Sequence, residues 1–206
     1  MFIENLERRF GANNPIFVED ILAAESNKSR PTVYRMIQRA VEEGTLMRYD
    51  RGIYYIPKQM EFGLAVPSVD RVVEKKYIGD NGEVYGIYGK LVMEVNFALS
   101  TQVPNTIEVI TNKEKRDVRE IEIRNRKVIL RKSRLPITSE NAAAYTLLEL
   151  FNGMNMKEYN DRVRRRVLEY AKEKNVTRQS LMGMAAAFPA RAVKNMAMSG
   201  VLYEVV

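Results

Sequence analysis

The chain has 206 residues, of which 46% are hydrophobic and 29% charged, and its formal net charge is +7. It contains neither cysteine nor histidine, which excludes disulfides, thiolate or histidine metal ligands, and catalysis by a Ser–His pair. The apolar content is that of a globular protein with a core, and the basic balance indicates an acidic partner such as nucleic acid.

Three helices are expected in the first 44 residues. The first covers residues 4–10 and the second residues 17–24, and a GANNP loop separates them because its glycine caps one helix and its proline blocks continuation. A third helix begins at Pro31 behind Ser29, the expected N-cap residue, carries an apolar stripe at helical spacing and ends at Gly44. This third helix is therefore amphipathic, with one face for a core and one for a partner.

Two short strand-like runs follow the third helix. They cover residues 46–49 and 53–56, and the turn Asp50-Arg51-Gly52 joins them into a hairpin. Three helices followed by a hairpin are typical of a winged helix-turn-helix domain. We therefore expect residues 1–58 to form such a DNA-binding domain.

The rest of the chain, residues 59–206, predicts a larger α+β domain with helices at its C-terminal end. Residues 59–75 are expected to form a linker helix. The other expected elements are strands over residues 84–88 and 107–111, a hairpin of residues 118–123 and 127–131 broken at Asn125-Arg126, and helices over residues 141–151, 157–174, 178–187 and 190–198. The fold class is thus α+β, with a winged helix-turn-helix first.

The third helix and the hairpin carry the residues that we expect to contact DNA. Residues 1–27 hold two basic side chains against five acidic ones, whereas residues 28–58 hold seven against three. Arginine and glutamine read base edges, hydroxyl groups bind phosphate, and arginines on a wing suit backbone or minor-groove contacts. The expected DNA-binding residues are Ser29, Arg30, Thr32, Tyr34, Arg35, Gln38, Arg39, Arg48 and Arg51. The alternative is a solvated polar face on a protein-interaction domain.

A second basic block lies between residues 113 and 134, where ten basic side chains stand against four acidic ones. The candidate surface consists of Arg124, Arg126, Lys127, Arg131 and Lys132. Strand pairs with alternating charges often present a solvated face, so this block is either such a face or a second DNA-contacting surface.

Carboxylates are the remaining candidates for catalysis. Glu108, Glu120 and Glu122 lie on expected strands, with Lys127 on the next strand, as a magnesium-dependent nuclease or nucleotidyltransferase would need. No compact acidic motif supports this pattern, and the stretch GDNGEVYGIYG lacks the Lys-Ser/Thr of a phosphate-binding loop. We therefore expect no enzyme, no catalytic residues, no metal and no cofactor.

Three segments resemble the AbiEi-type antitoxins of type IV toxin–antitoxin (abortive infection) systems. They are TVYRMIQRAVEEGTLMRYDRGIYYIP, YGIYGKLVMEVNFALSTQVPNTIEVITNK and VILRKSRLPITSENAAAYTLLELF. The resemblance covers about residues 17–151, and its most specific part is NFALSTQVPNTIEVITN, which is similar to the family phrase lgLttQvP…ei.tn. The helices of residues 157–206 match less distinctively.

The resemblance implies a DNA-binding autorepressor of a two-gene operon, with double-stranded DNA of its own promoter, at inverted repeats, as partner. It further implies a nucleotidyltransferase toxin that is opposed without a stable complex. The resemblance assigns roles to particular positions only in the third helix, the hairpin and the phrase Thr101-Gln102-Val103-Pro104. We expect that phrase to be structural.

Two other functions stay open from the sequence. One is a winged-helix transcriptional regulator whose C-terminal domain senses a ligand or assembles the protein, with no antitoxin role; the other is a DNA-acting nuclease. The opening MFIENLERRF lacks the apolar stretch of a signal peptide, and no apolar run approaches the ~18–20 residues that span a bilayer. We therefore expect a cytoplasmic protein without a membrane partner.

Overall fold

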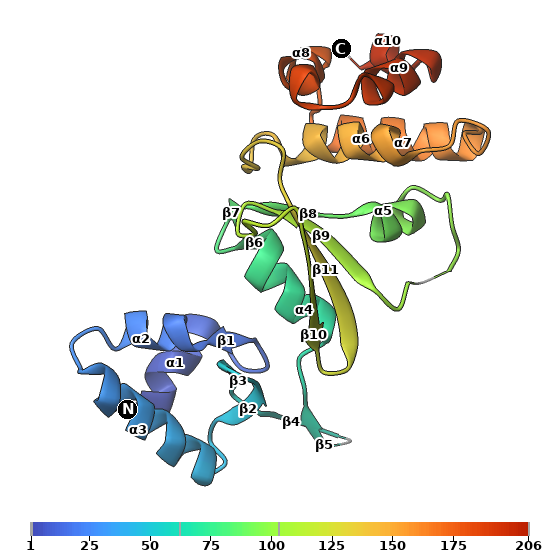
Figure 1. The fold of residues 1–206 in the computed structure, drawn as a ribbon. Helices are drawn as coiled ribbons and strands as arrows, with labels where there is room; N and C mark the ends of the chain where they lie inside the picture. The colour runs from blue at the N-terminus through green and yellow to red at the C-terminus, as the bar shows by residue number, and fades with distance from the viewer. Residues whose placement is uncertain (1, 62, 103, 206) are drawn as a thin grey trace. The chain divides into compact units, whose positions relative to one another are not determined.

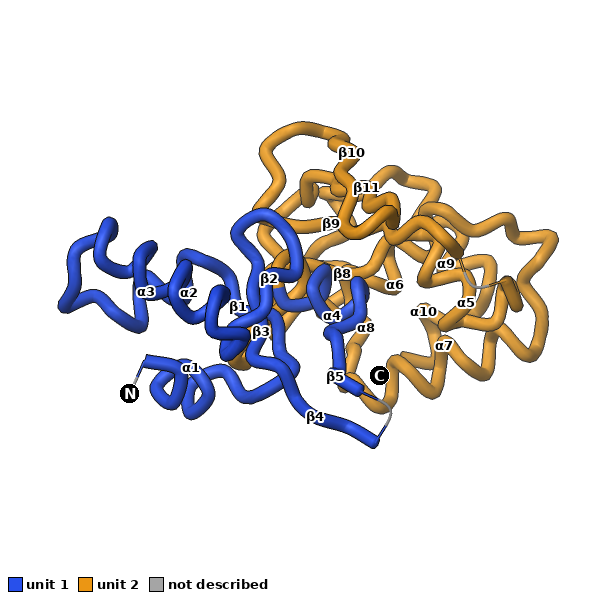
Figure 2. The backbone as a smooth tube through the Cα atoms, turned by 90° about the horizontal axis from the view of Figure 1, so that it is seen from below, with its two compact units in different colours: residues 1–75 blue, residues 76–206 orange. Residues whose placement is uncertain are grey.

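The computed structural model of the chain describes residues 2–61, 63–102 and 104–205. The structure is mixed α+β and divides into two compact units, unit 1 of residues 1–75 and unit 2 of residues 76–206 (Figure 1, Figure 2). The boundary at residue 58 that the sequence suggests falls inside unit 1. A functional division at residue 58 stays a prediction.

Unit 1 begins with the three expected helices, α1 (Phe2–Phe10), α2 (Val18–Ala24) and α3 (Arg30–Glu42). Ser29 caps α3 as expected, and Gly44 follows the helix with a φ of 71°, a conformation that glycine adopts without steric cost. The three helices meet in a core whose buried members are Leu6, Ile16, Ile21, Val33, Ile37, Ala40, Leu46 and Ile56. The apolar stripe of the third helix is therefore the face that α3 buries.

A three-stranded sheet completes this core. The expected hairpin forms β2 (Met47–Asp50) and β3 (Ile53–Tyr55), and β1 (Ile16–Phe17) pairs with β3 on its other side, giving the order β1-β3-β2. The sequence did not predict β1, because a two-residue strand has no periodicity of its own. Ile53 and Tyr55 are each 3% exposed, so the hairpin turns its apolar side inward.

The linker helix expected over residues 59–75 is wrong for most of that segment. Lys58–Met60 and Gly63–Ala65 form an antiparallel strand pair, β4 and β5, and only Val69–Val73 is α-helical, as α4, continued by a π-helical turn over Glu74–Ile78. Gly63 has a φ of 116°, which a helix does not accommodate, and Pro67 disfavours a helical conformation at the residue before it. The helix therefore starts only behind the Ser68 cap.

Unit 2 contains a four-stranded sheet of order β10-β11-β9-β8, in which β9 runs parallel to β11 and the other pairs are antiparallel. Its strands are β8 (Gly86–Tyr88), β9 (Ile107–Thr111), β10 (Val118–Ile123) and β11 (Arg126–Lys132), with α5 (Lys90–Asn96) between β8 and β9 and a small pair, β6 (Gly79–Asp80) and β7 (Glu83–Val84), before them. The expected hairpin and the strand over residues 107–111 are confirmed, whereas the expected strand over residues 84–88 is interrupted at Tyr85.

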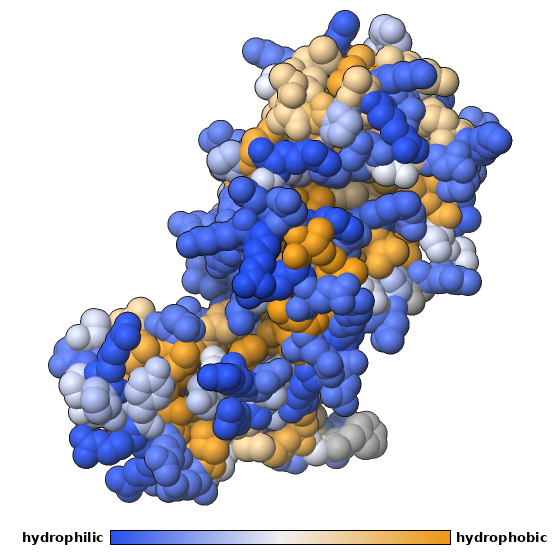
Figure 3. All heavy atoms as spheres, in the orientation of Figure 1, coloured by the Kyte–Doolittle hydropathy of each residue, from blue (hydrophilic) through white to orange (hydrophobic). Residues whose placement is uncertain are grey.

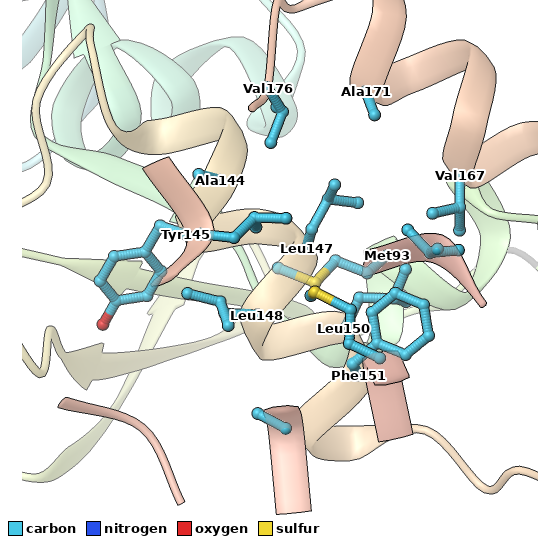
Figure 4. Close-up of a cluster of buried hydrophobic side chains, with 14 of the residues drawn as sticks. Met93, Ala144, Tyr145, Leu147, Leu148, Leu150, Phe151, Val167, Ala171 and Val176 are labelled. Carbon is cyan, nitrogen blue, oxygen red and sulfur yellow. The ribbon is translucent and has the colours of Figure 1, made fainter. Parts of the chain in front are cut away.

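The C-terminal helices pack around one of their number, the central helix α6. They are α6 (Ala142–Gly153), α7 (Asp161–Glu173), α8 (Arg178–Met184) with a 3-10 turn over Ala185–Ala187, α9 (Ala190–Met198) and α10 (Val201–Glu204). Figure 4 shows the α6 side chains Leu147, Leu150 and Phe151 beside Met93 and Val167, which come from α5 and α7. Because α6 is buried on most sides, it is the core helix of unit 2.

Candidate nucleic-acid interface

The candidate DNA-reading face is the side of α3 that points away from the unit 1 core. Val33, Ile37 and Ala40 are at most 3% exposed, and the residues between them at helical spacing lie on the opposite side. The exposed members are Arg30, Tyr34, Arg35, Gln38 and Arg39. In Figure 3 the surface over α3 is mainly hydrophilic, as this division of the helix requires.

The first residues of this face serve the helix as well as the surface. Ser29 Oγ accepts a hydrogen bond from the backbone N–H of Thr32 at 3.4 Å, and its hydroxyl lies 2.8 Å from Thr32 Oγ1. Such a cap satisfies a backbone N–H that the helix leaves without a partner. Ser29 and Thr32 therefore stabilise the N-terminus of α3, and any contact with a ligand would be in addition to that role.

In the C-terminal half of the face, the polar side chains pair with carboxylates one turn further along. Gln38 Nε2 donates to Glu42 Oε1 at 3.0 Å, and Arg39 Nε donates to Glu43 Oε1 at 2.8 Å, both across one helical turn. The hydrogen bond to Glu43 raises the pKa of Arg39, and the charge of Glu43 adds to that effect. Any ligand of Gln38 or Arg39 must compete with a carboxylate of the same helix.

The N-terminal half is different. The side chains of Arg30, Tyr34 and Arg35 make no hydrogen bond or ion pair with any residue that the structure describes, and Tyr34 is 50% exposed. Exposed aromatic and arginine side chains without partners are the types enriched in binding surfaces. These three side chains are therefore the part of α3 that is ready to contact a ligand.

The hairpin adds two arginines. Arg48 is exposed on β2, with its Nε 3.5 Å from the Asp50 carbonyl oxygen, while its neighbour Tyr49 is buried against Tyr55. In the turn, Asp50 Oδ1 accepts a hydrogen bond from the backbone N–H of Arg51 at 2.6 Å, and the Arg51 side chain is exposed. The buried tyrosines thus fix the hairpin, and both arginines point to solvent.

The start of α2 is not suited to phosphate. Its first turn contains Glu19 and Asp20, and Asp20 Oδ2 accepts a hydrogen bond from the Phe17 N–H at 3.1 Å and lies 3.5 Å from Lys75 Nζ. A helix N-terminus attracts anions only where its N–H groups are available. The first turn of α2 therefore adds nothing to the candidate surface of α3 and the hairpin.

The five residues of the candidate second basic surface do not share one face. Lys127 and Arg131 are on one side of the sheet, whereas Arg126 and Lys132 have the parity of the buried Val128 and Leu130. Arg124 lies in the turn between β10 and β11, with a φ of 45°. Period-two alternation, applied to all five positions, would have separated them at the sequence level.

Lys127, Arg131 and Arg126 are engaged within unit 2. Lys127 Nζ lies 2.8 Å from Glu120 Oε2, Arg131 is paired with Glu108, and Arg126 donates to the carbonyl oxygens of Pro104 and Asn105, at 3.3 Å each. Arg126 therefore holds the loop that contains the phrase expected to be structural. In that loop Thr101 and Gln102 are exposed, and Val103 lies outside the described residues.

Two of the three carboxylates considered for catalysis, Glu108 and Glu120, are partners in these ion pairs. Glu108 is 6% exposed and bound to Arg131, and Glu120 is bound to Lys127. Within residues 2–61, 63–102 and 104–205, no three Asp or Glu side chains gather as a metal site would require. These carboxylates thus have a structural use in the sheet.

Sequence reasoning missed the self-pairing of α3 and a cavity in unit 2. The spacing of Gln38 to Glu42 and of Arg39 to Glu43, four residues each, is the signal that would have revealed the first. Phe97, the C-cap of α5, and Tyr170 of α7 both line this cavity. No local pattern in the sequence relates these two residues.

Comparison with known proteins places the chain in a family. None of its described helices combines the length and apolar character needed to cross a bilayer. Neither a curated protein nor a solved structure matches the chain. Residues 3–151, well over half of its length, match the model of a family of unknown function, DUF6088. The chain belongs to the DUF6088 family.

Proposed function

We propose that the chain is a DNA-binding repressor of its own promoter, and that residues 1–58 act as a winged helix-turn-helix domain. The observation that carries this proposal is the exposed, unpartnered set of Arg30, Tyr34 and Arg35 on the outer face of α3. A helix with such a face fits the major groove, where arginine recognises guanine through two hydrogen bonds.

The position of the charges on α3 supports one orientation on DNA. The free arginines lie in its N-terminal half, and the acidic residues Glu42 and Glu43 lie at its C-terminal end. Recognition helices contact base edges mainly with their N-terminal residues. In this orientation Glu42 and Glu43 lie furthest from the base edges that the N-terminal arginines contact.

The hairpin supplies contacts of a second kind. Arg48 and Arg51 are exposed, on β2 and in the turn of the hairpin that follows α3 in the sequence. In this proposal they bind the DNA backbone or the minor groove, so they contribute affinity with little sequence preference. Their contribution depends on salt, because each phosphate contact releases counterions.

Footprinting on the DNA upstream of the chain's own reading frame tests this function. The expected result is a discrete protected region that covers inverted repeats, and loss of repression of a reporter when those repeats are scrambled. A chain that protects no region of that DNA, or that represses the scrambled promoter equally well, contradicts the proposal.

We further propose antitoxin activity for the part of the chain after residue 58, against a nucleotidyltransferase toxin and without a stable complex. The support is the resemblance of residues 85–151 to AbiEi-type antitoxins. A fragment of residues 59–206 should relieve the growth arrest caused by a cognate toxin and fail to repress the promoter. This start is preferable to residue 76, because a cut there divides the π-helical turn Glu74–Ile78.

Colony counts after co-expression with the toxin, alongside circular dichroism of the purified fragment, give the result. A folded fragment without protection, where the full chain protects, contradicts separable activities. The second candidate function is a winged-helix regulator with a ligand-sensing domain and no antitoxin role. The cavity in unit 2 favours it, and the absence of a nucleotidyltransferase reading frame next to the gene would distinguish it.

A further inference from the structure

Unit 2 contains a cavity of about 650 Å³ between its sheet and its helices. Its inner wall consists of Ile87 of β8, Met93 of α5 and Phe97, the C-cap of α5, which are at most 6% exposed. Ala142 and Thr146 of α6 and Tyr170 of α7 close the other side. The volume lies in the range that binds small organic ligands, about 300–1,000 Å³.

The wall of the cavity is partly aromatic. The rings of Phe97 and Tyr170 are in an edge-to-face arrangement, with centroids 5.2 Å apart and planes at 72°. Such a pair presents both a ring face and a ring edge to a third ring, and aromatic pairs of this geometry attract one another. The wall therefore favours a flat aromatic body over a flexible chain.

One polar feature lies within this apolar wall. The Tyr170 hydroxyl lies near Thr146, whose Oγ1 donates to the Ala142 carbonyl oxygen at 2.8 Å. Burial raises the pKa of Tyr170 further above its ordinary value of 10. The Tyr170 hydroxyl can donate a hydrogen bond to a ligand, and the oxygens of Tyr170 and Thr146 can each accept one.

The charges at the mouth of the cavity cancel. Arg166 lies 3.6 Å from Glu169, and Lys174 lies 3.5 Å from Glu173, all four being exposed residues of α7 or its C-cap. The lining thus contains two cations and two anions, with no uncompensated charge to bind an ion. A charged ligand would have to open one of these pairs to gain a partner, and its charge would lie beside an apolar wall.

We infer that this cavity is a binding site for an uncharged, flat aromatic molecule with one hydrogen-bonding group, its rings against Phe97 and Met93 and its polar group at Thr146 and Tyr170. The site lies in unit 2 and is independent of DNA binding, so its test uses the full chain without DNA. Failure of the test would leave the proposed repressor function unaffected.

N-phenyl-1-naphthylamine, an uncharged aromatic dye, is the probe. Its fluorescence should rise saturably with one dye bound per chain. Naphthalene-1-carboxamide should displace the dye at least about tenfold more effectively than naphthalene-1-carboxylate, which has the same rings and a charge. Equal displacement by both competitors overturns the uncharged ligand class, and dye binding that does not saturate overturns the site.

Ala142→Phe, which puts a ring into the cavity, should weaken dye binding at least about tenfold. Ala187→Phe is the matched control, since Ala187 is exposed and outside the lining, and it should bind the dye like the unmutated chain. Equal binding by the two variants contradicts the inference. If Ala142→Phe melts below its control, Asn96→Trp, at an exposed position of the cavity mouth, takes its place with the same two outcomes.

Discussion

Arg39 Nε lies 2.8 Å from Glu43 Oε1, one turn further along α3. The Arg39 side chain is 81% exposed and that of Glu43 is 50% exposed, so the pair faces solvent on the helix surface that we assign to DNA. An exposed pair of this kind contributes little to folding stability. Its consequence is for binding, because Glu43 competes with phosphate for Arg39 and repels phosphate itself.

Glu43→Gln is therefore expected to strengthen DNA binding. The variant releases Arg39 and removes one negative charge near the DNA, and a gain of about threefold to tenfold at low salt is the expected size. Fluorescence anisotropy with a labelled promoter duplex measures it. Glu7→Gln makes the same charge change on α1 and should alter the affinity for DNA by less than twofold. Equal gains in the two variants would mean that the effect comes from net charge and not from the release of Arg39.

Ile37→Asp should unfold unit 1. Ile37 is 3% exposed in the core beside Val33 and Leu46, where a carboxylate has no partner, and the expected loss exceeds about 3 kcal/mol. Gln38→Asp places the same side chain on the exposed face, where it breaks the hydrogen bond to Glu42 and adds a like charge one turn away, and should cost about 1 kcal/mol or less. Urea denaturation followed by circular dichroism compares them, and similar midpoints would show the core assignment to be wrong.

Gly86→Ala should destabilise unit 2, whereas Gly183→Ala should not. A Cβ at Gly86 would lie 2.0 Å from the Tyr77 carbonyl oxygen and 2.9 Å from that of Ile110, and neither backbone group can move alone. At Gly183, within α8, a Cβ meets no atom within 4 Å, so alanine should stabilise the helix by up to about 1 kcal/mol. Thermal melting of both variants measures the difference, and a melting temperature for Gly86→Ala at or above that of Gly183→Ala would refute it.

Glu114 should contribute stability that disappears in acid. Its carboxylate accepts hydrogen bonds from the N–H groups of Arg116 and Lys115, at 3.0 and 2.9 Å, and with Arg119 nearby these lower its pKa below the ordinary 4.5. A lowered folded-state pKa gives stability that is complete above pH 4.5 and lost as the pH falls through the folded-state value.

Glu114→Gln should accordingly cost about 2 kcal/mol at pH 7, and the difference from the unmutated chain should shrink in urea titrations at pH 4 and then 2.5. The control is Glu120→Gln, which removes a surface pair with Lys127 and should cost less than about 1 kcal/mol at pH 7. A cost for Glu114→Gln that is the same at pH 7 and 2.5 would contradict the lowered pKa.

The local features of α3 could be predicted from sequence, because a serine cap, an apolar stripe and a terminal glycine act within a few residues of one another. The strand β1 could not, since Ile16 and Phe17 become a strand only by pairing with Tyr54 and Ile53, which lie far along the chain. The parallel pairing of β9 with β11 is equally non-local. These contacts form because they bury apolar surface, not because of local propensity.

The candidate site, too, could be predicted only where a local pattern in the sequence determines it. The exposed face of α3 follows from helical periodicity, so Arg30 and Arg35 are where the sequence places them. The second basic surface was argued from charge alone, and the sheet separates its members because Arg126 and Lys132 follow the buried parity of β11. Charge density along a sequence says little about a surface until the strand faces are assigned.

The affinity of Arg35→Ala for the chain's own promoter tests the central claim most directly. Binding to the promoter duplex and to a scrambled duplex is measured over a salt series for the unmutated chain, Arg35→Ala and Arg51→Ala. Arg35→Ala should lose about 1–3 kcal/mol on the promoter and little on the scrambled duplex, whereas Arg51→Ala should weaken both and reduce the salt slope by about one. An Arg35→Ala chain that binds its promoter as tightly as the unmutated chain would contradict the assignment of α3 as the DNA-reading helix.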